Sequence, residues 1–495
     1  MDRAAKADYK TSAEMQGLKK MKAFLITELA EITEAHCETD IDSRVFFTGV
    51  STDSRTIKAG DCFFAISGEN FDGHDYVCDA FTNGAVCAVV SRDEKFTGGS
   101  IVRVSDTIKA LGDLAREYRR RMNFKVAAIT GSVGKTTTRQ IVHHVLSQHF
   151  GVHQSPKNFN NNIGLPLTLL GAEADDEIII AELGSNHPGE IAYLTGIAQP
   201  DIAVVTNVYP SHLSGFGDLG TITEEKLSIS EGLREGGVFI INGDIERLVK
   251  AGRDRGVEFI TFGRSKDCDI RVQDIVFGGS ESRFTIEEAE ITLPLAGRGN
   301  VENALAAWAV CSRFGISIDD FAQDIKRLGD YAGIAMRAQL MEIGTLTVLN
   351  DCYNANPASM RNALEILVNL KECRKRRSVF ICSDMAELGG QSEELHNELG
   401  ERIAEAKVHL VLAVGESAKI AAERAESTAG YNLQTKCFKD TLSACNNLKE
   451  FIKDYDMILV KGSRSCKLEQ VIEKLKELFS RMEAGSAKVE PRETR

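Results

Sequence analysis

Residues 126–138 constrain the fold of this chain more than any other stretch. They read Val-Ala-Ala-Ile-Thr-Gly-Ser-Val-Gly-Lys-Thr-Thr-Thr, so an apolar run leads into a glycine turn and then into a helix-forming segment. A strand, a turn, Lys-Thr and a helix in this order are typical of a phosphate-binding loop. The longer form of that loop has a glycine where Ile129 stands, so this sequence matches a shorter form. The alternative is a glycine-rich turn before an ordinary helix.

Each part of this loop has a physical role in holding a nucleotide. Glycines let backbone N–H groups curl around phosphate oxygens, and Lys135 would reach the outer phosphates. Thr136 would offer its hydroxyl to Mg2+, and the dipole of the helix that begins near Lys135 would favour the same anion. The predicted nucleotide-binding residues of the loop are Gly131, Ser132, Val133, Gly134, Lys135, Thr136 and Thr137.

Length and composition limit the possible functions. A chain of 495 residues is long enough for about three domains, each with its own core. The 59 Lys and Arg against 72 Asp and Glu give a net charge of −13, so neither nucleic acid nor an anionic membrane is an expected partner. The 12 cysteines are scattered without a C-x-x-C pair, and the sequence has no signal segment or long apolar run. These features predict a soluble, cytoplasmic α/β protein with reduced thiols.

The first part of the chain is predicted to be a flexible extension, 1–20, followed by a small α/β domain, 21–124. Short strands are expected near 62–66 and 85–90. Polar residues near strand ends commonly bind ligands, although a turn and an Asx cap are the simpler explanation here. The candidates are Ser54, Arg55, Asp72 and His74.

The middle of the chain, 125–335, alternates short apolar runs with helical patterns. Apolar runs at 178–181, 202–206 and 238–241 predict a parallel sheet flanked by helices. Chemistry in such a sheet collects at the carboxyl ends of the strands. Glu182 and His212 follow two of these strands, so a carboxylate and an imidazole could both meet the Mg2+ that accompanies a nucleotide.

An asparagine-rich segment, 157–166, cannot belong to a core, because each side-chain amide needs hydrogen-bond partners. We interpret it as a loop that binds a polar substrate through Lys157, Asn158, Asn160 and Asn161. Four histidines between 143 and 153 lack the context of an open metal site. They are predicted to lie on a helix and its exit rather than to bind metal.

The last third, 336–482, repeats the alternation of strands and helices and predicts a second, Rossmann-like doubly wound α/β domain. Strands are expected at 346–349, 379–382, 410–414 and 457–460. Polar insertions follow three of them, where a binding face would be. The residues 483–495 form a charged stretch without periodicity and are predicted to be disordered.

Four segments together resemble the Mur ligase family: 131–137, 157–166, 182–191 and 351–360. The resemblance extends from Met21 to about Met482 and depends on the order and spacing of these segments. It implies a monomeric, three-domain bacterial enzyme of peptidoglycan precursor synthesis, with UDP-sugar, ATP and dipeptide held by successive domains. The likeness is greatest to the ligase that joins D-alanyl-D-alanine to UDP-N-acetylmuramoyl-tripeptide through an acyl phosphate, with ATP and Mg2+.

The resemblance also implies roles for individual residues. Lys226 matches a lysine that the family uses as a carbamate, whereas the residues alone would place it on a solvated helix face. Catalytic roles are implied for Lys135, Glu182, His212 and Lys226. Metal ligation is implied for Thr136, Glu182, His212 and Lys226. Further nucleotide contacts are implied for Asn300, Asn303, Arg337 and Asp351. Substrate contacts are implied for Ser54, Arg55, Asp72, His74, Lys157, Asn158, Asn160, Asn161, Tyr353, Asn354 and Asn356.

Four positions depart from the usual pattern of the family: Tyr209, Ser228, Gly299 and Met336. Gly299 stands where a histidine is usual and leaves fewer polar groups to hold the base. None of the four belongs to the phosphate loop or the metal positions, so activity is expected. Three alternatives remain open: a folate polyglutamate ligase, a nucleotide-binding scaffold without turnover, and the sister ligase that adds the third amino acid. The Asp-Asn-Pro-Arg motif of that sister ligase is absent here.

Overall fold

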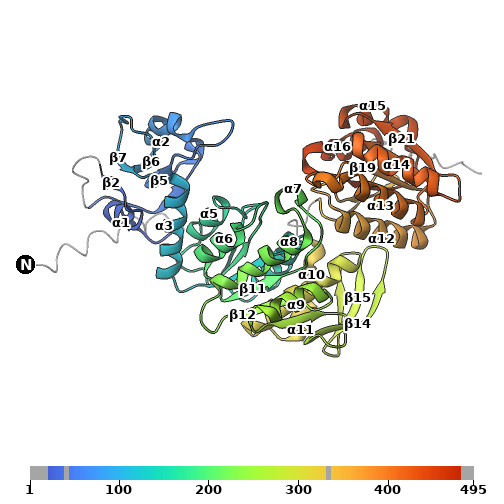
Figure 1. The fold of residues 1–495 in the computed structure, drawn as a ribbon, viewed down its shortest axis with the longest axis horizontal. Coiled ribbons are helices and arrows are strands. Elements are labelled where there is room, and N and C mark those ends of the chain that lie inside the picture. Colours follow the sequence, from blue (N-terminus) through green and yellow to red (C-terminus); the bar gives the residue numbers. More distant parts are fainter. Residues whose placement is uncertain (1–20, 38–43, 331–335, 481–495) are drawn as a thin grey trace, which may run out of the picture.

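The computed structural model describes residues 21–37, 44–330 and 336–480, arranged as three lobes that follow one another along the chain (Figure 1). The extension predicted at 1–20 and the disorder predicted at 483–495 lie outside the described residues. Across the described part of the chain, no helix is long and apolar enough to cross a membrane.

The first lobe contains a five-stranded sheet in the order β2-β7-β6-β5-β4, with only β2 antiparallel to its neighbour. The strands predicted near 62–66 and 85–90 are confirmed as β5 and β6. The strands are β1 (Phe24–Leu25), β2 (His36–Cys37), β3 (Phe46–Phe47), β4 (Gly49–Ser51), β5 (Asp61–Phe64), β6 (Cys87–Val90) and β7 (Ser100–Arg103). The helices are α1 (Ile26–Ile32), η1 (Ser54–Thr56), η2 (Gly73–Tyr76), α2 (Val77–Thr82) and α3 (Thr107–Arg121).

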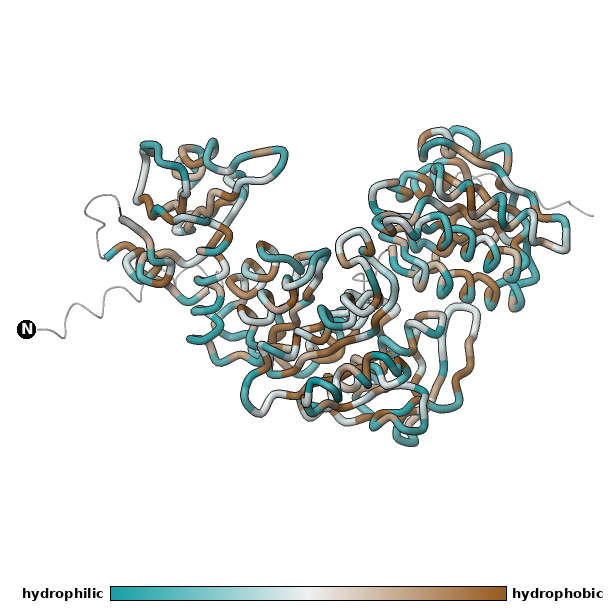
Figure 2. The backbone as a smooth tube through the Cα atoms, in the orientation of Figure 1, coloured by the Kyte–Doolittle hydropathy of each residue, from teal (hydrophilic) through white to brown (hydrophobic). Residues whose placement is uncertain are grey.

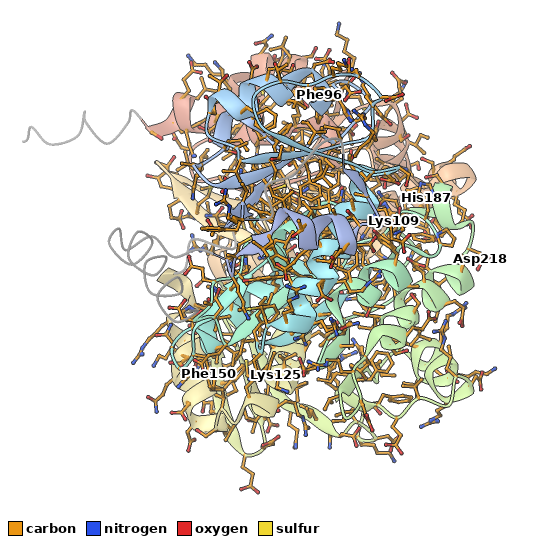
Figure 3. All side chains as sticks on the ribbon, turned by 90° about the vertical axis from the view of Figure 1, so that its left-hand side faces the viewer. Phe96, Lys109, Lys125, Phe150, His187 and Asp218 are labelled. Atoms are coloured by element: carbon orange, nitrogen blue, oxygen red, sulfur yellow. The ribbon has the colours of Figure 1, made fainter. Side chains whose placement is uncertain are left out.

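Helix α3 fastens the first lobe to the second. The Tyr118 hydroxyl donates to the carbonyl oxygen of Ala172 at 2.7 Å, and the buried Arg119 guanidinium lies 2.8 Å from the Asp201 carboxylate. Seen from the side of the first lobe, Lys109 of α3 lies between that lobe and the central sheet (Figure 3). These contacts hold the start of the central sheet against α3.

The central lobe contains a nine-stranded sheet in the order β16-β15-β14-β13-β12-β11-β8-β10-β9. From β9 to β14 neighbouring strands are parallel, as the alternating pattern predicts. The strands are β8 (Lys125–Thr130), β9 (Val152–Gln154), β10 (Ile178–Glu182), β11 (Ile202–Val205), β12 (Val238–Asn242), β13 (Ile260–Gly263), β14 (Ile270–Phe277), β15 (Ser282–Ile286) and β16 (Ala289–Leu293).

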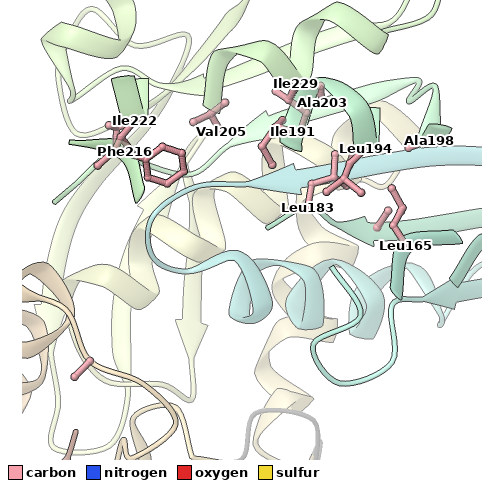
Figure 4. Packing of buried hydrophobic residues seen from close by; sticks show 14 of the residues in the cluster. Leu165, Leu183, Ile191, Leu194, Ala198, Ala203, Val205, Phe216, Ile222 and Ile229 are labelled. Carbon is pink, nitrogen blue, oxygen red and sulfur yellow. The ribbon is translucent and has the colours of Figure 1, made fainter. Parts of the chain in front are cut away.

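Successive residues of β8 point to opposite faces of the sheet, and helices cover both faces. Val126 and Ala128 pack in one apolar cluster with α5 and α6, whereas Ala127 and Ile129 pack in another with α4 and α10. Figure 4 shows part of the first cluster, and apolar stretches run through the middle of the central lobe in Figure 2. The helices are α4 (Lys135–Leu146), α5 (Gly164–Leu170), α6 (Glu190–Ala198), α7 (Leu213–Phe216), α8 (Leu219–Leu227), α9 (Glu246–Asp254), α10 (Arg298–Cys311) and α11 (Ile318–Lys326).

An antiparallel extension at one edge of the central sheet is absent from the sequence-based expectation. There β14, β15 and β16 pair antiparallel, and β15 buries Phe284 and Ile286 while it exposes Arg283. This alternation is the two-residue period of a strand with one solvated face.

The third lobe is a six-stranded sheet in the order β17-β18-β22-β19-β20-β21, parallel except for β17. The predicted doubly wound arrangement is confirmed, since α12, α13 and α14 contribute to one apolar cluster and α15 and α16 to another. The strands are β17 (Gln339–Ile343), β18 (Leu346–Asn350), β19 (Ser378–Ser383), β20 (Leu410–Val414), β21 (Gln434–Phe438) and β22 (Met457–Lys461). The helices are α12 (Pro357–Arg374), α13 (Ser392–Glu405), α14 (Glu416–Thr428), α15 (Thr441–Phe451) and α16 (Glu469–Phe479).

Candidate functional site

The glycine turn after β8 requires glycine at two positions. Gly131 and Gly134 have φ angles of 144° and 85°, which side chains rarely adopt. A Cβ atom on Gly131 would lie 2.0 Å from Thr206 Oγ1, and one on Gly134 would lie 2.1 Å from Asn303 Oδ1. The loop therefore fits closely between β11 and α10, and α4 begins directly after it at Lys135.

Asn207, which follows β11, holds the loop from the neighbouring strand. Its side-chain oxygen accepts from the backbone N–H of Val133 at 2.8 Å, and its carbonyl oxygen accepts from the N–H of Ser132 at 3.1 Å. Lys135 turns back across the loop and donates to the Gly131 carbonyl oxygen at 2.6 Å. Burial lowers the pKa of Lys135, although Glu182 opposes that shift. Asn207 therefore holds the loop from the neighbouring strand, and the Lys135 ammonium lies across the loop.

Glu182 ends β10 as a buried carboxylate beside the first turn of α4. Its Oε2 accepts from the Thr136 hydroxyl at 2.9 Å, and its Oε1 accepts from Asn160 Nδ2 at 3.0 Å. Burial by itself would raise the pKa of this carboxyl, but Lys135, Arg337 and Arg139 together hold it below its ordinary value. Glu182 is therefore an anion at neutral pH.

Arg139 positions Glu182 and was not singled out by the sequence. Its side chain is 1% exposed, and its Nε lies 3.3 Å from Glu182 Oε2. The same guanidinium donates to Gln154 Oε1 at 2.7 Å and to the carbonyl oxygens of Ser155 and Lys157. It thereby ties β10 to the start of the asparagine-rich loop.

His212 lies beyond β11 in the left-handed region, with φ 50°, at the start of α7. Its Nδ1 is hydrogen-bonded to Glu387, a residue of the third lobe. The backbone N–H of Ser214 also donates to the Glu387 carbonyl oxygen, at 3.1 Å. Burial lowers the pKa of His212, whereas Glu387 acts to raise it.

Lys226 lies at the end of α8 and is buried, so its interpretation as a solvated helix residue is wrong. It is 2% exposed, and its Nζ donates to Ser185 Oγ at 2.6 Å. The Phe216 ring lies 5.5 Å from the same nitrogen. Burial, followed by the charge of Lys135, lowers the pKa of Lys226 to about 7. A substantial fraction of this amine is therefore neutral at physiological pH.

A cavity of about 840 Å³ joins these groups to the third lobe. It brings together most of the predicted nucleotide, metal and substrate residues. The predicted residues that line it are Ser132, Val133, Gly134, Lys135, Thr136, Thr137, Asn158, Asn160, Asn161, Glu182, His212, Asn300, Asn303, Arg337, Asp351, Tyr353, Asn354 and Asn356. Lys226 is not part of its lining but touches Ser185, which is.

The residues from the third lobe form a linked group at one wall of this cavity. The Arg337 guanidinium lies 4.1 Å from the centre of the Tyr353 ring. Asp351 accepts from Lys461 Nζ at 2.7 Å, and Lys461 also donates to the Asn354 carbonyl oxygen at 3.0 Å. Lys461 thus fixes the segment that follows β18.

Asn300 and Asn303, which are predicted to contact the nucleotide, are bonded inside the protein. Asn300 Nδ2 donates to the Ala296 carbonyl oxygen at 2.8 Å, and Asn303 Nδ2 donates to Asn300 Oδ1 at 3.3 Å. The Thr138 hydroxyl donates to Asn303 Oδ1 at 3.4 Å, which links α10 to α4. At Gly299 the backbone N–H donates to Asn362 of the third lobe at 3.0 Å.

The candidates in the first lobe lie outside this cavity. Both ring nitrogens of the buried His74 are bonded, Nδ1 to Asp72 at 2.6 Å and Nε2 to the backbone N–H of Ser91 at 2.9 Å. Asp72 also caps η2, and Arg55 pairs with Asp53, which caps η1. The turn and Asx-cap explanation therefore describes these residues, and their contact with a substrate stays a prediction. Lys157 likewise does not line the cavity, although its neighbours in the loop do.

A second cavity, of about 420 Å³, lies at the amino ends of the central strands, opposite the large cavity. It is lined by the amino ends of β8 and β10 together with Phe150, and Figure 3 shows Phe150 near Lys125. Among the nearby histidines, His149 pairs with Asp324 at 2.8 Å. Within the described ranges of the chain, no three His, Cys, Asp or Glu side chains form a metal-binding group.

Comparison with known proteins gives a consistent result. Three family models match successive parts of the chain: the catalytic domain of the Mur ligase family over 46–119, the Mur ligase middle domain over 129–311, and the Mur ligase glutamate ligase domain over 336–464. The UDP-N-acetylmuramoyl-tripeptide–D-alanyl-D-alanine ligase of Bacillus subtilis is 35% identical over 459 residues, 91% of this chain and 98% of that protein.

Two solved structures extend the similarity to three dimensions. A crystal structure of MurF from Acinetobacter baumannii matches with a TM-score of 0.84 and 30% identity, over 92% of this chain and 100% of that one. MurF from Thermotoga maritima in complex with ADP matches with a TM-score of 0.75 and 27% identity, over 88% of this chain and 98% of that one.

Proposed function

This chain belongs to the Mur ligase family, and we propose from that premise that it joins D-alanyl-D-alanine to UDP-N-acetylmuramoyl-tripeptide with the use of ATP. The observation that carries the proposal is the cavity of about 840 Å³, in which a phosphate loop, a buried carboxylate and polar groups of the third lobe meet. Both substrates are small molecules. The proposed setting is peptidoglycan precursor synthesis in a bacterial cytoplasm.

The chemistry of amide formation explains why such a cavity is needed. A carboxylate is a poor electrophile because its oxygen is a poor leaving group, whereas phosphate leaves readily. Transfer of the terminal phosphoryl group of ATP to the tripeptide carboxylate forms an acyl phosphate and ADP. The dipeptide amine then attacks the acyl carbon and phosphate departs. Because water would hydrolyse the acyl phosphate, a site closed between two lobes suits the reaction.

The phosphate loop is proposed to hold the nucleotide and to stabilise charge during phosphoryl transfer. Asn207 already accepts from the N–H groups of Ser132 and Val133, so the backbone N–H groups from Gly134 to Thr137 would bind phosphate oxygens, and the N-terminus of α4 would favour the same charge. Lys135, which donates to the Gly131 carbonyl oxygen in the structure, would move its donor to the outer phosphates. Asn300, Asn303, Arg337 and Asp351 would complete the nucleotide site.

The donor set beside the loop fits Mg2+. Glu182 and the Thr136 hydroxyl present hard oxygen ligands 2.9 Å apart, and Mg2+ commonly uses few protein ligands in addition to phosphates and water. His212 and Lys226 are proposed as further groups of this site. Bound there, the ion would neutralise the developing phosphate charge.

Lys226 is suited to become a carbamate. Carbamate formation needs a neutral amine, and burial lowers the pKa of Lys226 to about 7. The product is an anion, which would bind a cation that the ammonium form would repel. The Ser185 hydroxyl, 2.6 Å from Nζ, is placed to donate to such a group.

Substrate contacts are proposed on both sides of the loop. Asn158, Asn160 and Asn161 line the cavity and would bind the peptide of the UDP-sugar substrate together with Lys157. In the third lobe, Tyr353, Asn354 and Asn356 would bind the dipeptide. Ser54, Arg55, Asp72 and His74 are proposed to lie near the UDP-sugar in the first lobe.

We propose a division into domains at 21–124, 125–335 and 336–482. The five-, nine- and six-stranded sheets support this division, because each of them has helices of its own packed against it. Expression of 336–482 alone tests the last boundary, and cooperative melting of that fragment is the expected result.

The test of the proposed function is the acceptor dependence of ADP formation. Purified protein with ATP and Mg2+ should release ADP rapidly only when UDP-N-acetylmuramoyl-tripeptide and D-alanyl-D-alanine are both present. A folate polyglutamate ligase would instead respond to folate and glutamate, and a scaffold without turnover would release ADP with neither pair.

A further inference from the structure

Glu302 is the one acidic side chain of α10 that lines the large cavity, and no described residue donates a hydrogen bond to it. Part of its surface is open to the cavity, yet the surrounding protein raises its pKa to about 7 through burial. By contrast, the neighbouring Asn300 and Asn303 are bonded inside the protein. A partly buried carboxyl without a hydrogen-bond donor is a site where a ligand can supply one.

Two further side chains lie with Glu302 beyond the carboxyl ends of the central strands. Tyr209 follows β11, is part of the cavity lining and has its pKa raised by burial and by the charge of Glu302. Arg264 follows β13 and also lines the cavity, and its backbone N–H donates to both carboxylate oxygens of Asp244, at 3.0 and 2.8 Å. The charges of Arg264 and Arg298 favour the anionic form of Glu302, whereas Asp244 and Glu365 oppose it.

Glu302 cannot serve the phosphates of the nucleotide. A carboxylate would repel phosphate oxygens, and the phosphate loop already supplies donors for them. An aromatic ring and an unpaired carboxyl that line one cavity suit a heteroaromatic ligand that carries an amino group, because the ring can stack while the carboxyl accepts from the amino hydrogens. A ribose diol could also donate to the carboxyl, but a planar base covers an aromatic face more fully than a sugar does.

We propose that Tyr209 and Glu302 recognise the adenine base, with Glu302 accepting a hydrogen bond from the exocyclic amino group. This role rests on the proposed use of ATP. It also supplies the base with polar contacts at a site where Gly299 offers no side chain. In its protonated form the same carboxyl can donate to a ring nitrogen while it accepts from the amino group.

Inosine triphosphate tests this contact, because it carries a carbonyl oxygen in place of the amino group. The KM of the wild-type protein for inosine triphosphate should exceed that for ATP about tenfold or more, since a site that binds a polar group rejects an analogue that lacks it. In Glu302→Ala the KM for ATP should rise until this ratio approaches one, with kcat nearly unchanged. In Glu302→Gln the amide can donate to the carbonyl oxygen, so the KM for inosine triphosphate should fall.

Two further variants make the experiment decisive. Tyr209→Ala should raise both KM values about equally, because both bases would lose the aromatic ring. Glu246→Gln, at an exposed position of α9, removes a charge without changing the ratio. A ratio that is unaltered in Glu302→Ala would overturn the proposal. The proposal would also be overturned if Glu302→Ala changed only the ratio of the KM values for 2′-deoxyATP and ATP, because that result would assign Glu302 to the ribose.

Binding without turnover separates this inference from the proposed function. Titration of wild type and Glu302→Gln with ADP and inosine diphosphate should reproduce the same selectivity even if another acceptor pair proves to be the substrate. Failure of the acceptor test with intact ADP selectivity would reject the proposed substrates alone. Equal affinities of the wild-type protein for the two diphosphates would reject base recognition alone.

Discussion

His212 of the central lobe is hydrogen-bonded through its Nδ1 to the carboxylate of Glu387 in the third lobe. Both residues have left-handed backbone conformations, with φ angles of 50° and 63°. The contact leaves Nε2 of His212 as the ring nitrogen available for other partners. A carboxylate that holds one nitrogen of a histidine fixes both the orientation and the tautomer of the ring.

Glu387→Ala should raise the Mg2+ concentration needed for half-maximal activity by about tenfold, because loss of such a supporting carboxylate weakens metal binding by 10- to 100-fold. Glu387→Gln should have a smaller effect, since its amide oxygen can still accept from Nδ1. Titration of ligation rate against Mg2+ measures the change. Glu393→Gln, exposed in the first turn of α13, is the control. An unchanged Mg2+ dependence in Glu387→Ala would show that the pair only joins the lobes.

Arg139→Met should lower the free energy of unfolding by about 3–5 kcal/mol, because it leaves Glu182 as a buried charge without its guanidinium partner. The free energy of unfolding of Arg139→Lys should lie between those of the wild type and Arg139→Met, since an ammonium cannot reach all the acceptors that the guanidinium reaches. Urea unfolding measures both variants. Arg253→Met, at an exposed position of α9, should change stability by less than about 0.5 kcal/mol.

Lys135→Ala should reduce ligation about a thousandfold, because it removes a charge-assisted contact to the phosphates in the transition state. Binding of the UDP-sugar substrate should be nearly unchanged, since the residues proposed for that substrate lie in other segments. Single-turnover kinetics and calorimetry measure the two effects. Turnover within tenfold of wild type would contradict the assigned role of Lys135.

Lys226→Ala should remove most activity, and high bicarbonate or a short-chain carboxylate should partly restore it by filling the space left by the side chain. Lys226→Arg should fail without rescue, because its cation cannot be carbamylated and would repel the metal. Near-normal ligation by Lys226→Arg would decide against a carbamate.

Glu302→Gln should stabilise the protein more at pH 8 than at pH 5. Burial raises the folded-state pKa of Glu302 from 4.5 to about 7, so the folded state binds more protons than the unfolded state between these values. The free energy of unfolding of the wild-type protein therefore falls across this window relative to the variant. The stabilisation by Glu302→Gln should be about 1–3 kcal/mol greater at pH 8 than at pH 5. Equal stabilisation at both would show that the carboxyl titrates normally.

The sequence predicts what depends on neighbouring residues and misses what depends on distant ones. The phosphate loop could be predicted because its strand, turn and helix are contiguous. Arg139 could not, because an arginine within a helix usually faces solvent and its partners come from β10 and the loop near Ser155. Lys226 has a polar flank in Glu224 and Glu225, so only the packing of α8 shows that it is buried.

The antiparallel edge of the central sheet was missed for a different reason. Its signal is present in the alternation of Phe284 with Ile286 and of Ile291 with Leu293, but each run is short and preceded by a charged residue, Arg283 or Glu290. The buried runs of the parallel strands are longer and uniformly apolar, so they dominate the pattern. The contacts of Asn300 and Asn303 could not be predicted either. Whether these amides face a ligand or bond inside the protein depends on how α10 packs against α4.

The lining of the large cavity begins at Ser132 and ends at Ser465. During synthesis a chain emerges from the ribosome with its amino end first, and domains fold in that order. The phosphate loop can therefore be complete while the opposite wall is still untranslated. An incomplete chain could bind a nucleotide but would lack the surfaces that bring the amine to it, so premature termination before β22 yields a product that cannot complete ligation.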